Sequence, residues 1–223
     1  MNTDKNEIER HLCDTLPICD FNTLLTPAML PKAILFDMDG TLTEPYLDFD
    51  LIKREMGIER TQPILEALAA MPAERRAVAE RILHGHEERA ADASTLNPGC
   101  VELLSWVREH KMETALVTRN SRRSVRTVFD LHGLHFDVCV TREDGKFKPN
   151  PAPLLLACER LKVRPSDAWM VGDGYHDIDA GVAAGIRTVW VSHDKQRSFV
   201  NQPWRTVRDL LELTELLRAC LYQ

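Results

Sequence analysis

Short apolar runs alternate with amphipathic stretches through most of the chain. Five apolar runs of strand length lie at residues 34–36, 114–117, 137–140, 168–172 and 186–191. Stretches with the apolar spacing of helices follow them at residues 100–110, 125–131, 153–161, 178–184 and 207–221. Strands and helices that alternate in this way predict a parallel sheet joined by right-handed crossovers. We therefore expect an α/β fold with a Rossmann-like, three-layer core.

A helical segment of roughly fifty residues interrupts the alternation between the first and the second predicted strand. Asp48 is placed to cap a helix that Gly57 ends. Thr61 is placed to cap a second helix, and residues 73–91 form a third, charged one. Because the insertion follows the first strand directly, we expect a lid over the site rather than a decorative hairpin. The expected parts are an N-terminal arm (1–31), a core (32–43 and 97–223) and a small helical cap (44–96).

The composition narrows the range of partners and locations. The net charge of -6 argues against a broad nucleic-acid interface, although it leaves room for a local basic pocket. The six cysteines are scattered, and no apolar run approaches the length of a membrane span. The first thirty residues carry five acidic side chains and no continuous apolar stretch, unlike a signal peptide. We expect a cytoplasmic protein, monomeric or homodimeric, with neither a nucleic-acid nor a membrane partner.

Two carboxylates lie where the first apolar run ends. Asp37 and Asp39 are followed directly by Gly40 and Thr41. Ligands of open α/β sheets bind outside the carboxyl ends of the strands, so these acids are expected at the site. Their mutual repulsion is usually offset by a hard divalent cation with oxygen ligands. The alternative is a structural turn in which the aspartates bind their own backbone.

Three further positions near later strand ends carry polar side chains. Thr118 follows the second strand and could bind a phosphate oxygen, although a helix-capping threonine is the common alternative. Lys148 lies in a proline-stiffened loop and could neutralise a phosphoryl group; the alternatives are a surface lysine or Lys146 in its place. Asp173 and Asp177 follow the fourth strand and could approach one cation, or they could cap the next helix. His176, one of the three residues between them, is predicted to face solvent without a role in the site.

These four motifs, in this order, resemble those of the haloacid dehalogenase-like (HAD) superfamily of hydrolases. The matching segments are Asp-x-Asp-Gly-Thr, the strand-ending threonine, Lys-Pro-x-Pro and Gly-Asp-x-x-x-Asp. The position of the insertion resembles subfamily I, with a helical C1 cap, and phosphoglycolate phosphatases in particular. The resemblance implies that Mg²⁺ is held by Asp37, Asp173 and the backbone carbonyl of Asp39, while Asp177 orients the site.

The resemblance also implies a reaction. Asp37 would be the nucleophile that forms an aspartyl-phosphate, and Asp39 would act as general acid and then as general base. The substrate phosphate would sit between Mg²⁺, Thr118, Lys148 and the backbone amides of Asp39, Gly40 and Thr41, and the expected catalytic residues are Asp37, Asp39, Thr118 and Lys148. Arg119 and Asn120 are candidates for reading the rest of the substrate.

The expected function is therefore Mg²⁺-dependent hydrolysis of a small phosphorylated metabolite. A phosphosugar mutase would need the same four motifs, together with a cap that holds a bis-phosphorylated intermediate. The predicted cap is short, which disfavours the mutase. A non-catalytic binding protein on the same scaffold is the remaining alternative, and the presence of every motif residue disfavours it.

Overall fold

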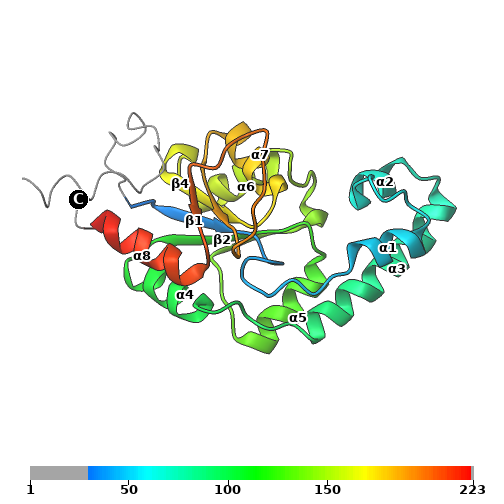
Figure 1. Ribbon diagram of the computed structural model, residues 1–223, viewed down its shortest axis with the longest axis horizontal. Helices are drawn as coiled ribbons and strands as arrows, with labels where there is room; N and C mark the ends of the chain where they lie inside the picture. Colours follow the sequence, from blue (N-terminus) through cyan, green and yellow to red (C-terminus); the bar gives the residue numbers. More distant parts are fainter. Residues whose placement is uncertain (1–29, 222–223) are drawn as a thin grey trace, which may run out of the picture.

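A computed structural model describes residues 30–221 of the chain. Its centre is a parallel sheet of six strands in the order β3-β2-β1-β4-β5-β6 (Figure 1). The strands span Ala33–Phe36 (β1), Glu113–Val117 (β2), Val138–Val140 (β3), Ala168–Gly172 (β4), Arg187–Val191 (β5) and Arg205–Val207 (β6). The predicted α/β class is confirmed, and the five predicted strands are present. The sixth strand, β6, was not predicted, and the closing helix begins only after it. The predicted N-terminal arm lies almost entirely outside the described residues.

Helices cover both faces of the sheet, which gives the predicted three layers. They are Cys100–Glu109 (α4), Arg122–His132 (α5), Ala152–Leu161 (α6), Tyr175–Ala184 (α7) and Leu210–Leu221 (α8). Along β1, Ile34 and Phe36 pack with α4, α5 and α8, whereas Ala33 and Leu35 pack with α6 and α7. This alternation is the two-residue period of a strand that is buried on both faces. All four residues of β1 are fully buried, so the first strand runs through the middle of the core.

Three of the four helices between β1 and β2 extend to one side of the sheet (Figure 1). They are Phe49–Met56 (α1), Ile64–Ala70 (α2) and Ala73–Asp92 (α3). As predicted, Asp48 caps α1 through its side chain and Gly57 ends the helix in the left-handed conformation. The prediction that Thr61 caps the second helix is wrong, because α2 begins after Pro63 without a side-chain cap.

These helices share an apolar cluster of their own, which is separate from the two clusters on the sheet. Ile52 of α1, Leu65 and Leu68 of α2 and Leu83 of α3 are buried in it, and Phe147 from the loop after β3 packs against it. A short helix cannot be stable in water by itself, so this shared burial is what holds the three helices together. Among the described residues, none of the helices combines the length and apolar character needed to cross a bilayer.

Candidate active site

The predicted site residues converge at the carboxyl edge of the sheet. Asp37 directly follows β1, Thr118 follows β2 and Asp173 follows β4. Because β1 lies between β2 and β4, these three strand ends are immediate neighbours. The Asp37 amide donates to the carbonyl of Val171 on β4 at 2.9 Å, and this hydrogen bond continues the pairing of β1 with β4 and fixes the backbone of Asp37. A cavity of about 420 Å³ opens above this edge and is lined by all three side chains.

Lys148 reaches into the same place from the loop after β3. Its ammonium lies 2.9 Å from Asp37 and 2.6 Å from Asp177, and the side chain is only 1% exposed. Burial opposes the charge, but the carboxylates of Asp177 and Asp37 outweigh it and raise the pKa of Lys148. Lys146, the competing candidate, is exposed to solvent. The structure therefore places Lys148, and not Lys146, beside the expected nucleophile.

The acidic side chains of the site suit a hard cation. One carboxylate oxygen each of Asp37, Asp173 and Asp177 lies within 4.8 Å of the other two. The Lys148 ammonium pairs with the carboxylates of Asp37 and Asp177. Burial, together with the nearby charge of Asp37, raises the pKa of Asp173, so a cation placed here would stabilise its ionised form. An all-oxygen donor set with excess negative charge is what Mg²⁺ prefers.

Asp39 has surroundings unlike those of Asp37. Its carboxylate accepts a hydrogen bond from the side-chain amide of Asn120 at 2.7 Å and a longer one, 3.4 Å, from the hydroxyl of Thr43. Burial, reinforced by the charge of Asp37, raises the pKa of Asp39 to about 6. A carboxyl group with a pKa near neutral can both donate and accept a proton, which is what a general acid–base group requires. Asn120 contacts Asp39 and also lines the cavity, and its contact with substrate stays a prediction.

The turn that follows Asp37 and Asp39 requires glycine. Gly40 has φ of +75°, and a Cβ at this position would lie 2.6 Å from a carboxylate oxygen of Asp173. The Gly40 amide donates to the carbonyl of Thr43, and the Thr41 amide donates to that of Met38. The turn itself thus uses both amides in this structure, and their binding of phosphate stays a prediction. The Thr41 side chain is fully buried and does not line the cavity.

Thr118 and Arg119 occupy different roles at the end of β2. The Thr118 hydroxyl lines the cavity and accepts a hydrogen bond from the Asn120 amide at 3.2 Å. The capping alternative for Thr118 is excluded, because the Ser121 side chain caps α5. The Arg119 guanidinium makes two hydrogen bonds to Glu66 on α2, and it also donates to the carbonyl of Lys148. Arg119 therefore ties α2 to the core and also lines the cavity, and its contact with substrate stays a prediction.

Several residues around the cavity were not predicted from the sequence. His176 was predicted to face solvent; instead it is half-buried, lines the cavity beside Arg119, and has its pKa lowered to about 3 by burial and by that guanidinium. The indole of Trp190 donates to the carbonyl of Asp173 at 3.0 Å, and His193 lies 2.6 Å from the carbonyl of Gly40. These contacts join segments distant in sequence, so no local motif indicates them.

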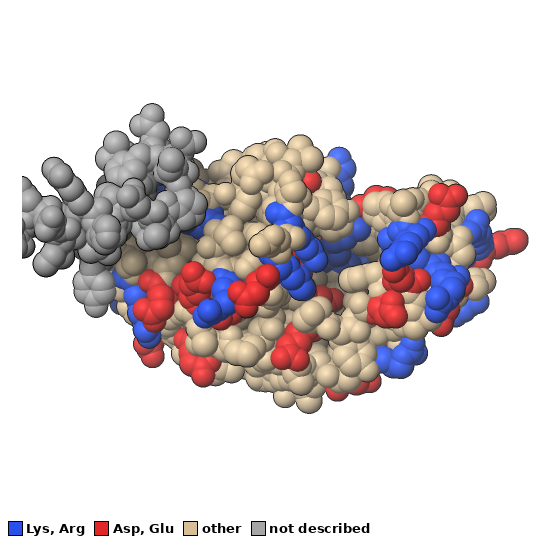
Figure 2. Space-filling view, in the orientation of Figure 1, with Lys and Arg blue, Asp and Glu red and all other residues tan. Residues whose placement is uncertain are grey.

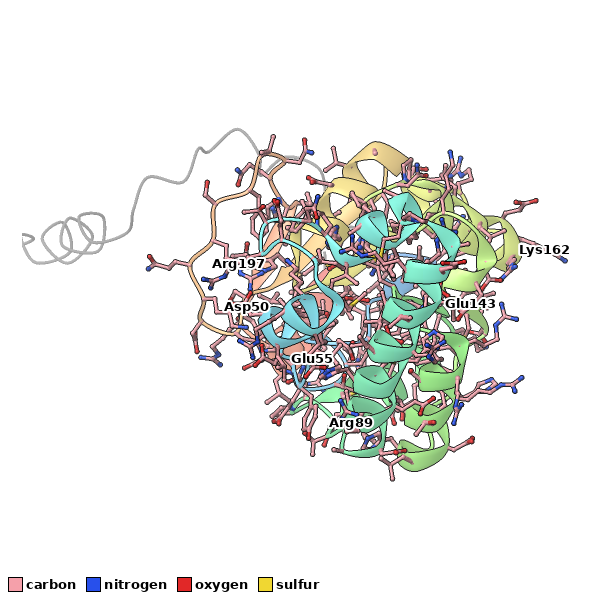
Figure 3. The ribbon with its side chains drawn as sticks, turned by 90° about the vertical axis from the view of Figure 1, so that its right-hand side faces the viewer. Asp50, Glu55, Arg89, Glu143, Lys162 and Arg197 are labelled. Carbon is pink, nitrogen blue, oxygen red and sulfur yellow. The ribbon has the colours of Figure 1, made fainter. Side chains whose placement is uncertain are left out.

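The helical insertion supplies the outer wall of the cavity. Leu47, Ile64, Leu65 and Leu83 line it with apolar surface, and Glu87 of α3 lines it with a carboxylate. Figure 2 shows the hollow between these helices and the sheet, with Lys and Arg side chains near its rim. Figure 3 faces α1–α3 and shows Arg197, which follows β5 and also lines the cavity. The signal for Glu87 was present in the sequence: it continues the buried row of α3, four residues after Leu83.

Comparison with known proteins agrees with this geometry. The sequence profile described as "Hydrolase: haloacid dehalogenase-like hydrolase" matches residues 31–185. An uncharacterized hydrolase of Saccharomyces cerevisiae is 30% identical over 84% of this chain and 91% of its own length. Phosphoglycolate phosphatase 1 of Pseudomonas aeruginosa is 31% identical over 71% of this chain and 68% of its own. The chain is a member of the haloacid dehalogenase-like hydrolase family.

A solved structure shares the fold. CbbY of Rhodobacter sphaeroides, crystallised with phosphate, superposes with a TM-score of 0.63 at 22% identity, over 82% of this chain and 96% of that one. At this level of identity the likeness concerns the fold alone. The family membership and the fold that the motifs implied are thus confirmed.

Proposed function

We propose that the protein is a Mg²⁺-dependent phosphatase that hydrolyses small phosphomonoesters through an aspartyl-phosphate on Asp37. One observation carries the proposal: the buried Lys148 ammonium lies 2.9 Å from Asp37, at the floor of a cavity that Asp39 and Thr118 also line. The names of relatives support it, among them phosphoglycolate phosphatases and an N-acetylmuramic acid 6-phosphate phosphatase of Pseudomonas putida.

In the first half of the reaction, a carboxylate oxygen of Asp37 attacks phosphorus and the bond from phosphorus to the ester oxygen breaks. Asp39 gives its proton to the departing alcohol oxygen. Lys148 and the Thr118 hydroxyl hold the phosphoryl oxygens and offset their charge. A Mg²⁺ bound by Asp37, Asp173 and the backbone carbonyl of Asp39 would neutralise the phosphoryl group further.

In the second half, water attacks the phosphorus of the aspartyl-phosphate. Asp39, now ionised, takes a proton from this water, and the bond between phosphorus and the Asp37 oxygen breaks. Inorganic phosphate leaves and Asp39 is protonated again. Asn120 holds the Asp39 carboxyl in place through both steps, and the pKa of Asp39, near 6, suits both roles.

We also propose that residues 44–96 act as the cap of this site. Their helices share one apolar cluster and wall the cavity, and the two hydrogen bonds from Arg119 to Glu66 fasten α2 to the core. A cap in this position excludes water from the reacting groups. The predicted cytoplasmic location and oligomeric state stay predictions.

The test is phosphate release from p-nitrophenyl phosphate by metal-free protein, with and without added Mg²⁺. We expect release only with Mg²⁺, none from Asp37→Asn, and a phosphorylated enzyme visible by mass spectrometry in Asp39→Asn. Asp130→Asn, an exposed change on α5, is the matched control and keeps full activity. Normal turnover by Asp37→Asn would refute the nucleophile. Isomerised sugar phosphate in place of free phosphate would indicate the mutase.

A further inference from the structure

Glu87 is a buried carboxylate that the reaction above does not use. It lies on α3 and is 4% exposed. One of its oxygens accepts a hydrogen bond from Arg142, in the 3-10 turn (Arg142–Asp144) that follows β3. The other oxygen, Oε2, is shielded from solvent and has no hydrogen-bond partner among the residues that the structure describes. Glu87 lines the main cavity together with Asp39 and Asn120.

This arrangement is costly for folding. Ala79, Leu83 and Ala91 occupy the same buried side of α3 at four-residue steps from Glu87. An apolar residue there would continue the row, whereas a buried carboxylate with an unmatched oxygen costs the free energy of its desolvation. Burial raises the pKa of Glu87, but the pairing with Arg142 favours its charged form. A fixed, charged acceptor at the wall of a catalytic cavity is suited to recognising a ligand.

Building on the phosphatase function proposed above, we propose that Glu87 is a specificity residue, which accepts a hydrogen bond from a hydroxyl or amino group on the alcohol part of the substrate. A carboxylate accepts hydrogen bonds and cannot donate them, so it favours ligands that carry donors. A substrate whose alcohol part ends in a carboxylate brings only acceptors to this oxygen, so the two groups would face each other with no hydrogen to share. The preferred substrates are then phosphate esters of polyhydroxy or amino alcohols, in preference to small phosphorylated acids such as phosphoglycolate.

The rest of the cavity agrees with this class. Its volume of about 420 Å³ lies within the range that is typical of sites for small organic molecules. Asp39 is a second acid that lines the cavity with Glu87, and the guanidinium of Arg119 is engaged by Glu66. Two other cationic side chains of the wall donate to backbone carbonyls, Lys53 to that of Arg60 and Arg197 to that of Asp173. Leu47 and Ile64 provide apolar surface for the carbon chain of the alcohol.

The experiment compares two matched pairs of substrates with the wild-type protein and Mg²⁺. Each pair differs only in a terminal CH₂OH or carboxylate group: 2-hydroxyethyl phosphate against phosphoglycolate, and glycerol 3-phosphate against 3-phosphoglycerate. The two pairs differ in chain length, so their terminal groups extend to different distances from the phosphate toward Glu87. We expect kcat/KM for the hydroxyl member to exceed that for the acid at least tenfold in one or both pairs, since one charge-assisted hydrogen bond supports roughly a tenfold to hundredfold preference.

Two variants locate the preference. Glu87→Gln keeps the shape and removes the charge, and we expect it to reduce the hydroxyl-to-acid ratio at least tenfold, with much of the change in KM. Glu88→Gln removes the neighbouring carboxylate, which pairs with Arg123 at the surface, and should leave the ratio as in the wild type. Circular dichroism confirms that each variant is folded.

The outcomes separate this inference from the general function. No release of phosphate from any ester, including p-nitrophenyl phosphate, would remove the phosphatase proposal itself. Hydrolysis with a wild-type preference for the two acids would overturn the role of Glu87 alone, whether or not Glu87→Gln folds. An unchanged ratio in folded Glu87→Gln would overturn it as well.

Discussion

The buried Lys148 offers the sharpest test of the site, because one ammonium serves two carboxylates there. Lys148→Met keeps most of the length of the side chain and removes only its charge and hydrogen bonds. Asp177, whose side chain is 4% exposed, then lacks its counter-charge at 2.6 Å. Removing one partner of a buried ion pair typically costs about 3 to 5 kcal/mol in the free energy of unfolding. For a chain of this size, that loss lowers the melting temperature by roughly 6 to 20 °C.

The loss should depend on pH. Burial, followed by repulsion from Asp37, already raises the pKa of Asp177 in the presence of the lysine. In the variant this pKa rises further, so the folded state holds a proton that the unfolded state, with an aspartate pKa of about 3.9, has released. A group whose folded pKa is raised loses stability as the pH rises toward that value. The difference between the wild type and the variant should therefore widen from pH 6 to pH 8.

The assay is urea unfolding followed by circular dichroism, in EDTA so that no metal ion replaces the lost charge. Lys146→Met, in the same loop but exposed, is the control and should change the free energy of unfolding by less than about 0.5 kcal/mol. The double variant Lys148→Met, Asp177→Asn should recover part of the loss. If Lys148→Met unfolds within 1 kcal/mol of the wild type, or if the double variant is less stable than the single one, the buried ion pair does not carry the energy assigned to it.

Three further predictions concern the turn, the cap contact and the histidine. Gly40→Ala should cost about 1 to 3 kcal/mol in urea unfolding and impair Mg²⁺-dependent activity, because its Cβ would collide with Asp173; wild-type behaviour would contradict this. Glu66→Gln and Arg119→Met should show a coupling of roughly 1 kcal/mol in a double-mutant cycle, and simple additivity would mean that the cap contact is energetically silent. The pKa of His176 is about 3 in the folded chain, below the ordinary value of 6.5 in the unfolded chain. Between these two pH values the unfolded chain binds more protons, so the free energy of unfolding of the wild type falls as the pH drops below 6.5. His176→Gln should make the free energy of unfolding less dependent on pH in this range. The slope of the wild type stays below about 1.4 kcal/mol per pH unit, because the ring is partly solvated. Equal slopes for the wild type and the variant would refute this prediction.

Much of the core was predictable because its signals are local. The run Ile34–Phe36 is buried on both faces and ends directly in the acids, so strand and site share one sequence feature. Strand β6 escaped prediction because it has three residues, Arg205–Val207, and only its valine is buried. Helix α7 begins at Tyr175, three residues before the predicted start, because the Asp177 carboxylate accepts from the Gly174 amide and extends the first turn.

The acids of the site were found for the same reason, whereas its long-range contacts were not. Arg119 follows the strand-ending threonine, and its sequence position suggested contact with a ligand. Its partner, Glu66, is 53 residues away on a helix whose packing the sequence does not reveal. The hydrogen bonds of the Gly40 and Thr41 amides within the turn were not foreseen either, because they depend on how tightly the turn closes, which composition alone does not determine.

The apolar cluster that α1, α2 and α3 share has a consequence for how this protein could change. The groups that would break the phosphate bond are anchored to the sheet, while Leu83 and Glu87, which line the outer wall of the cavity, belong to a helix held by a different set of buried side chains. Substitutions that reshape the helical wall therefore need not disturb the packing beneath Asp37. Replacing residues 44–96 by a helical segment of another length should alter which esters are accepted and leave the bond-breaking apparatus intact.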